Sequence, residues 1–342
     1  MFNYILRRFA IMIPTLLGIT IVVFGIINLA PGSPIEQKIQ QLRFGGMGDS
    51  GSSEIGDKES AVSEEVIEAL KKQYGFDKPV HMRYFLWLKN LSKLEFGESF
   101  TYEEPVWDVI VSKFPVSLQF GIVSLIFSYL VCIPLGVLKA TTHGSTFDTL
   151  SSVALFGMYS IPSFMLGILL IVFFSGGAFF EWFPVGELVS DNYDDLTTWG
   201  KVGDRLVHFI LPLVSYMVGQ FTILTMLMKN SLLEEIKKDY IRTARAKGVR
   251  EKFIYLKHAL RNALIPIVTG LGSFLSFFFA GGILIETIFQ LDGIGLLGYQ
   301  SVLERDYNVI MGLVFLQSFL MLIGNLLSDL AYVVVDPRID FK

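Results

Sequence analysis

The stretch SLLEEIKKDYIRTARAKGVREKFIYLKHALRNALIP, residues 231–266, places a strongly basic segment between two long apolar segments. Ten Lys or Arg residues but only four Asp or Glu residues lie between Lys229 and Ala263. A charged side chain at the centre of a bilayer costs about 2.5 to 3.5 kcal/mol, so this loop cannot lie in lipid. Because loops rich in Lys and Arg stay on the inner side, the charge bias predicts a cytoplasmic loop between two transmembrane helices.

The composition of the whole chain agrees with a membrane protein. Hydrophobic residues make up 52% of the 342 residues, and charged residues make up only 18%. The chain has one cysteine, Cys132, in an apolar run, so no disulfide can form within it and a small buried side chain is expected. The composition therefore predicts an all-α polytopic membrane protein.

Six apolar segments are long enough to cross the hydrocarbon core, which needs about 20 helical residues. The first follows Arg7 and Arg8, as a secretory signal would, but its apolar run is too long and residues 28–30 make a poor cleavage site. We therefore expect an uncleaved first helix. The six predicted transmembrane helices are residues 9–29, 118–138, 150–174, 209–228, 265–288 and 310–335.

Charge also predicts the topology. Four predicted helices lie between Arg8 and Lys229, an even number, so both basic regions face the cytoplasm. The N-terminus, the C-terminus and the short turn at 139–149 are then cytoplasmic, and three segments face outward. The predicted organisation is an N-terminal tail and first helix (1–30), an external loop or subdomain (31–113), a transmembrane domain (114–335) with its basic loop at 229–264, and a cytoplasmic tail (336–342).

The external segment 31–113 divides into two parts. Residues 45–60 form a Gly/Ser/acidic tract that cannot bury enough surface to fold alone. A helix is expected from a cap at Ser63, and a small external subdomain is predicted over residues 63–99. Its aromatic and apolar residues would pack it, or alternatively bind a partner: Tyr84, Phe85, Trp87 and Leu88.

The basic loop has two amphipathic halves separated by Gly248, which can adopt a left-handed conformation and end the first half. The apolar stripes predict two helices that face the membrane surface or a groove on another protein. The residues at helical spacing are Leu232, Leu233, Ile236, Tyr240 and Ala244 in the first half, and Phe253, Leu256, Leu260 and Leu264 in the second.

The runs DYIRTARAKG (239–248) and HALRNALIP (258–266) resemble the coupling loop of ATP-binding-cassette (ABC) importer permeases of the dipeptide/oligopeptide branch. The general motif begins with Glu-Ala-Ala where this chain has Arg242, Thr243 and Ala244, and Pro266 lies further on than its counterpart. A role for that glutamate therefore does not transfer. The resemblance assigns ATPase coupling to Asp239, Tyr240, Arg242, Thr243, Ala244, Ala246, Gly248, His258, Asn262 and Pro266.

Further runs extend the resemblance over nearly the whole chain. The Gly/Ser-rich insertion, the Phe-Pro-Val run at 183–185 and the ending at 335–341 are most similar to the Yej-type permeases of this branch, which serve oligopeptides and microcin C. The matching runs are YILRR (4–8), IPTLLG (13–18), APG (30–32), YGFDKP (74–79), FGES (96–99), FPVSL (114–118), IPLG (133–136), ETIF (286–289) and GIG (293–295).

The resemblance implies a permease subunit with the type I ABC importer transmembrane fold in the bacterial inner membrane. The implied partners are a second similar permease, two cytoplasmic ATPase subunits or one fused ATPase, an extracytoplasmic solute-binding protein, the peptide and lipid, but not nucleic acid. ATP and Mg²⁺ would serve the partner subunits. The chain has no Gly-x-x-x-x-Gly-Lys-Ser/Thr motif, so we expect no enzyme activity, bound cofactor or metal in it. Dipeptides, murein peptides, glutathione and nickel chelates remain alternative substrates.

Candidates for the substrate pathway are few. Glu286 lies near the outer end of the fifth predicted helix, where it could gate the pathway or contact a peptide, or instead cap the following bend. Ser160, Pro162 and Ser163 interrupt the third predicted helix and could mark a kink that lines the passage.

Two other classes of function remain open on the residues alone. A secondary transporter or channel predicts internal repeats and paired acidic groups or histidines at mid-membrane, and neither is evident. An intramembrane enzyme needs clustered nucleophiles or metal ligands. The four histidines, His81, His143, His208 and His258, instead fall in loops or at helix ends, without neighbours at ligand spacing.

Overall fold

The computed structural model describes residues 2–32, 34–36, 68–69, 71–72, 75–177, 179–270 and 282–335. The chain divides into two compact units, and each is described by itself. Unit 1 comprises Met1–Ala10, Lys113–Leu296 and Phe319–Lys342, and unit 2 comprises Ile11–Ser112 and Leu297–Ser318.

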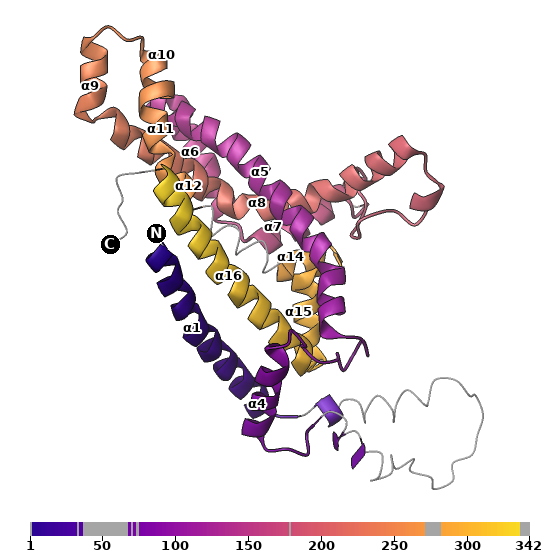
Figure 1. Cartoon of the computed structure of the whole chain (residues 1–342). Coiled ribbons are helices and arrows are strands. Elements are labelled where there is room, and N and C mark those ends of the chain that lie inside the picture. Colours follow the sequence, from indigo (N-terminus) through magenta and orange to yellow (C-terminus); the bar gives the residue numbers. More distant parts are fainter. Residues whose placement is uncertain are drawn as a thin grey trace. The chain divides into compact units, whose positions relative to one another are not determined.

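Helices and turns make up the described residues, apart from an isolated bridge between Glu98 and Pro105. The elements in chain order (Figure 1) are α1 (Phe2–Leu29), α4 (Val80–Leu91), α5 (Val106–Thr141), α6 (Thr146–Tyr159), α7 (Ser163–Phe174), η1 (Tyr193–Asp195), α8 (Thr198–Ile236), α9 (Asp239–Ala246), α10 (Glu251–Phe253), the π-helix η2 (Ile254–Ala259), α11 (Leu260–Ala263), α12 (Ile265–Thr269), α14 (Ile283–Ile288), α15 (Ile294–Leu303) and α16 (Tyr307–Val335).

Four helices in the described residues are long and apolar enough to cross a membrane: α1, α5, α8 and α16. They correspond to the first, second, fourth and sixth predicted transmembrane helices. Each is longer than its apolar run, because helical hydrogen bonding continues into polar flanks. In α8, for example, the Thr197 side chain accepts a hydrogen bond from the Gly200 amide and caps a helix of 39 residues.

The third predicted helix, 150–174, is not continuous. It consists of α6 and α7, which are bent by 93° at a short break. Pro162 stands at the N-cap of α7 and cannot donate a backbone hydrogen bond, and Ser160 uses its hydroxyl to bond the Phe156 carbonyl at 2.8 Å. A kink at Ser160, Pro162 and Ser163 is therefore confirmed. Helices α6 and α7 have 14 and 12 residues, each too few to span the core alone, so the third predicted helix is one broken span only if the two are counted together.

Several predictions fall outside the described residues. The middle of the fifth predicted helix, 271–281, is among them, and only its ends are described, as α12 and α14. The described part thus contains four candidate spans, or five if the bent pair counts as one, and the sixth stays a prediction. The tract at 45–60, the cap at Ser63 and the tail 336–342 also lie outside.

In unit 2, residues of α1, α4 and α16 share a small apolar core centred on Ile27, Trp87 and Met311. Tyr84 and Leu88 pack against it, so the packing role predicted for these two residues and Trp87 is confirmed. Phe85 does not share that role, because it is 67% exposed on the other face of α4.

In unit 1, α8 is the central helix, and α6, α7, α11, α12 and α14 pack along it. Cys132 is fully buried in the same core, as predicted. The start of α1 and the end of α16 also meet in this unit, because the Arg8 guanidinium lies 2.6 Å from the Asp329 carboxylate. This ion pair therefore joins the N-terminal part of α1 to the C-terminal part of α16.

Candidate functional site

The loop between α8 and α12 folds as a helical hairpin whose turn is Gly248 (Figure 1). Gly248 has a φ of +78°, the left-handed conformation predicted for it. Its amide donates to the Arg245 carbonyl at 3.0 Å, and the Val249 amide donates to the Ala244 carbonyl at 3.3 Å. These bonds satisfy carbonyls at the end of α9, so glycine ends the first half of the loop as expected.

The predicted stripe of the second half is confirmed for Leu260 and Leu264, which pack against the core, but not for its first two residues. Phe253 and Leu256 are 56% and 49% exposed, whereas Ile254 and Ala259 are fully buried. The π-helix at Ile254–Ala259, whose hydrogen bonds join residues five apart, separates these two buried residues by five positions. The prediction assumed a regular α-helical period, which no longer holds after Phe253.

The buried face of the loop packs on the core of unit 1. Leu232, Ile241, Ile254, Ala259 and Ala263 belong to one apolar cluster with residues of α5 and α8. Most of the predicted first-half stripe, including Leu233, Ile236 and Ala244, packs against this cluster too. The apolar side of the hairpin is thus largely covered by the chain itself rather than presented to another surface.

The side chain of Tyr240 joins three parts of the loop through hydrogen bonds. The Tyr240 hydroxyl donates to Oε2 of Glu235 at 2.5 Å and accepts from Nδ2 of Asn262 at 3.0 Å. Lys238 pairs with the other oxygen of Glu235. Burial, together with the hydrogen bond to Glu235, raises the pKa of Tyr240 to about 12. The end of α8, the start of α9 and α11 are therefore held together by one side-chain network.

Two ion pairs lie on the outer surface of the hairpin. Arg245 binds Glu251 through two contacts, at 2.5 and 3.1 Å, across the Gly248 turn. Arg242 and Asp239 lie 3.6 Å apart and are largely exposed. Such exposed pairs are screened by water, so they stiffen the hairpin less than its buried face does.

The predicted coupling residues thus separate into two sets. Tyr240 and Asn262 are hydrogen-bonded to each other, and the His258 carbonyl lies 3.5 Å from the same phenol. Ala244 packs at the edge of the core. The remaining residues lie on the exposed surface of the hairpin or at the start of α12: Asp239, Arg242, Thr243, Ala246, Gly248 and Pro266.

A buried cluster of charges beneath the loop was not predicted from the sequence. Asp148, in the first turn of α6, contacts Lys229 of α8 at 2.6 Å and Lys139 of α5 at 3.1 Å. Lys139 also donates to the hydroxyls of Ser151 and Ser152. A usable signal was present, since Lys139 and Lys229 each adjoin an apolar run and the single Asp148 lies in the short turn between two predicted helices.

Glu286 is fully buried and accepts four hydrogen bonds. Its donors are the Ser117 and Tyr216 hydroxyls, at 2.7 and 3.1 Å, and the amides of Gly282 and Leu296, at 3.2 and 3.0 Å. These groups come from α5, α8 and both sides of the bend after α14. The arrangement is that of a group that organises the bend, and a gating role for Glu286 stays a prediction.

The other pathway candidates lie at the break between α6 and α7, and no direct contact joins them to Glu286 among the described bonds. Past the break, α7 lies close to the end of α14. A Cβ at Gly167 would be 3.1 Å from the Phe289 ring and 3.3 Å from the Ser215 hydroxyl. Whether Ser160, Pro162 and Ser163 line a passage stays a prediction.

A known protein family and several known proteins match this chain. The family model described as "Binding-protein-dependent transport system inner membrane component" matches residues 132–341. Similar proteins include the peptidoglycan transport system permease protein YejB of Agrobacterium fabrum (46% identical, covering 99% of this chain and 98% of the relative) and the inner membrane ABC transporter permease protein YejB of Escherichia coli O157:H7 (42%, 99% of each). The oligopeptide transport system permease protein AppB of Bacillus subtilis is 35% identical over 99% of each chain.

The family match includes the whole coupling hairpin, and the relatives match over almost their full length. The chain therefore belongs to the family of binding-protein-dependent transport system inner membrane components, the permease subunits of ABC transporters.

Proposed function

We propose that this chain is the permease subunit of an ATP-driven, binding-protein-dependent importer of peptides. The observation that carries the proposal is the hairpin at 237–264, folded onto the α8 core with its Gly248 turn exposed, in a chain of this family. Relatives named for peptidoglycan and oligopeptide transport support oligopeptides, including peptides of peptidoglycan type, as the substrate class. We include peptides of microcin C type in the proposed class. Dipeptides, glutathione and nickel chelates are the competing substrates.

The hairpin is suited to transmit movement. Its apolar face is fixed to α5 and α8, and the Glu235–Tyr240–Asn262 network fixes its polar side. A partner that moves the exposed turn therefore moves α8, which continues without a break through 39 residues. Nucleotide-driven closure of two ATPase subunits, or of one fused ATPase, would switch the helices between inward-open and outward-open states.

The rest of the proposed assembly follows from the family. A second, similar permease forms the other half of the pathway in a type I ABC importer fold, and a solute-binding protein delivers the peptide outside. This chain is non-catalytic, and ATP and Mg²⁺ act in the ATPase subunits. The segment from 31 to 113 is the external part.

We place the N- and C-termini in the cytoplasm of a bacterium, with the chain in the inner membrane. Two contacts support this topology. The Arg8–Asp329 pair holds the start of α1 and the end of α16 together. The Asp148–Lys229 pair places the turn at 139–149 beside the basic loop, which the charge bias assigns to the inside.

The test is peptide-stimulated ATPase activity of the complex reconstituted with its partner subunits and binding protein. Gly248→Asp puts a side chain and a negative charge on the exposed turn, where a Cβ has open space but the φ is unfavourable. We expect stimulation to be lost while the complex still assembles. Gly203→Asp, which adds the same group near the other end of α8 where a Cβ also has open space, should leave stimulation in place. Unchanged stimulation in Gly248→Asp would show that the hairpin does not couple ATP hydrolysis to transport.

A further inference from the structure

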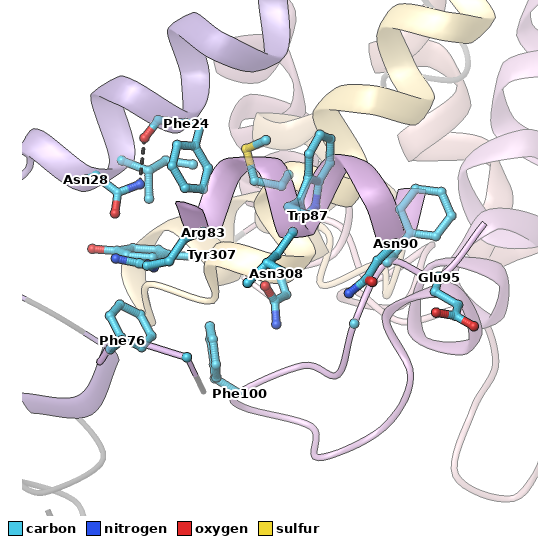
Figure 2. Close-up of a pocket in the computed structure, with 16 residues that line it drawn as sticks. Phe24, Asn28, Phe76, Arg83, Trp87, Asn90, Glu95, Phe100, Tyr307 and Asn308 are labelled. Atoms are coloured by element: carbon cyan, nitrogen blue, oxygen red, sulfur yellow. Dashed lines mark hydrogen bonds between the residues drawn. The ribbon is translucent and has the colours of Figure 1, made fainter. Parts of the chain in front are cut away.

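Unit 2 contains a pocket of about 190 Å³ that the proposed transport cycle does not use. Its walls come from the end of α1, from α4, from residues 95–100 and from the start of α16 (Figure 2). This volume is slightly larger than the roughly 150 Å³ cavity that accepts a benzene molecule. The pocket therefore has room for one aromatic or branched side chain, and not for a whole peptide.

One side of the pocket carries a positive charge. The Arg83 guanidinium lies 3.9 Å from the centre of the Phe76 ring and 6.0 Å from that of Phe24, and Figure 2 shows Tyr307 close to it. Within the residues that the structure describes, Arg83 forms no ion pair with a carboxylate. Burial lowers the pKa of Arg83 below its usual value, but an arginine this basic remains charged. The site thus holds a half-buried cation on aromatic faces.

A second polar group in the pocket lacks a partner. The Trp87 side chain lines the pocket and is only 8% exposed, and its buried Nε1 has no hydrogen-bond acceptor among the described residues. Proteins rarely leave a buried N–H without an acceptor, because the unmade hydrogen bond is costly, so Trp87 is an unusual residue of this wall. Because Trp87 Nε1 is itself closed off from solvent, Trp87 contributes a ring to the wall, and Arg83 is the donor that the pocket presents to a ligand.

The other residues that line the pocket near Arg83 are apolar or uncharged. Phe96, Phe100 and Met311 supply apolar surface, and Asn90 supplies an amide. The acidic residue of the lining, Glu95, lies at the far end of the pocket from Arg83 in Figure 2. A ligand that fits has an apolar body about the size of one residue and a carboxylate that accepts from Arg83.

We propose that this pocket binds the C-terminal residue of a peptide, with its carboxylate at Arg83 and its side chain against the aromatic wall that includes the Trp87 ring. The proposal rests on the proposed function for the identity of the ligand. Since residues 75–100 of the lining belong to the segment assigned to the outside, and the α1 residues of the lining lie at the end of α1 that leads into that segment, the pocket would receive peptides there. A phospholipid headgroup offers a similar anion, but two acyl chains exceed the volume available.

The test uses the reconstituted complex, without binding protein, in phosphatidylcholine nanodiscs and labelled with 5-fluorotryptophan. The chain has four tryptophans, and the resonance that disappears in Trp87→Phe identifies Trp87. We expect this resonance to shift saturably with the peptide Ala-Ala-Phe and much less with its C-terminal amide. Arg83→Gln should weaken the apparent affinity about tenfold or more, because a hydrogen bond to a charged group is lost.

Two further variants separate binding from folding. Lys89→Gln removes an exposed charge from the same helix and should leave the titration unchanged. Arg83→Lys keeps the charge without the planar fork, and should bind more weakly than the wild type but more tightly than Arg83→Gln. The proposal is overturned if the Trp87 resonance does not respond to Ala-Ala-Phe, if the amide binds equally well, or if the resonance responds only to added phosphatidylglycerol.

The pocket and the proposed function can fail separately. If the Trp87 resonance does not respond to peptide while the complex retains peptide-stimulated ATPase activity, the pocket proposal is wrong and the proposed function stands. If the Trp87 resonance shifts saturably with peptide but the ATPase activity does not depend on the Gly248 turn, the coupling proposal is wrong and the carboxylate-binding pocket stands.

Discussion

The ammonium group of Lys229 lies 2.6 Å from Oδ1 and 2.8 Å from Oδ2 of Asp148, although 81 residues separate them in the chain. With Lys139 they form a cluster whose side chains are 0%, 6% and 11% exposed for Lys139, Asp148 and Lys229. Two cations share one carboxylate, so the cluster depends on Asp148 for its charge balance. It joins α5, α6 and α8 where the coupling hairpin begins.

Asp148→Asn should therefore destabilise unit 1 by about 3 kcal/mol, because two buried cations lose their counter-charge. The measurement is the thermal unfolding of the purified chain in detergent. Asp195→Asn, an exposed acid of the same unit, serves as the control and should change little. Adding Lys229→Met to Asp148→Asn should recover part of the loss. A double variant no more stable than Asp148→Asn would contradict the charge-balance account.

Gly248→Ala tests the backbone conformation without steric conflict. A Cβ there meets no atom within 4 Å, so its cost comes from the positive φ alone, about 1 to 2 kcal/mol. We expect amide hydrogen exchange in α9 to become at least about fivefold faster. Gly203→Ala, in the open surface of α8, should instead slow exchange near its own position, since alanine favours helix. Equal effects of the two variants would mean that the turn carries no strain.

Tyr240→Phe removes the hydroxyl that joins Glu235 to Asn262 and leaves the ring in place. We expect the local stability of the hairpin to fall by about 1 kcal/mol and peptide-stimulated ATPase activity to fall with it, because the exposed turn then moves without α8. Tyr159→Phe removes an exposed hydroxyl at the end of α6 and is the control. Normal coupling in Tyr240→Phe would assign the network to stability alone.

The sequence predicts the long helices well, since α1, α5, α8 and α16 each carry an apolar run that only a membrane or a core can accommodate. It also predicts the turn at Gly248, because glycine favours the left-handed conformation found there. It fails where hydrogen bonding departs from the α-helical pattern. The π-helix at Ile254–Ala259 was not predicted, because it depends on how neighbouring helices pack. The sequence did mark the position of the break at Ser160 and Pro162, but not its angle of 93°.

The hydrogen-bond partners of a buried polar side chain also cannot be predicted from one sequence. Glu286 is an acid at the end of an apolar segment, and the sequence left two roles open for it, in the substrate pathway or in capping the following bend. Only the fold reveals that Ser117, Tyr216 and two amides surround it, and they come from positions up to 169 residues away. Spacing along the chain identified the acid but not what it binds.

Glu286→Gln should destabilise the bend after α14 by roughly 2 kcal/mol, because all four neighbours donate and an amide nitrogen cannot accept. Thermal unfolding measures the change, with the exposed Glu304→Gln as control. A Glu286→Gln variant with unchanged stability but altered peptide transport would favour the gating role over the structural one.

The Arg245–Glu251 pair gives the hairpin a pH dependence whose sign is fixed by its geometry. The hydrogen bonds from Arg245 lower the pKa of Glu251, so the pair stabilises the turn above the ordinary glutamate pKa of about 4.3, and that stabilisation is lost as the pH falls through the lowered value. Carboxyl-carbon NMR of glutamate-labelled protein should show Glu251, identified by its absence in Glu251→Gln, titrating below the usual range. Arg245→Gln should raise that pKa toward the ordinary value, whereas Arg242→Gln, which removes the neighbouring pair with Asp239, should not. If both variants shifted Glu251 equally, the general positive charge of the hairpin, and not the contact with Arg245, would control its titration.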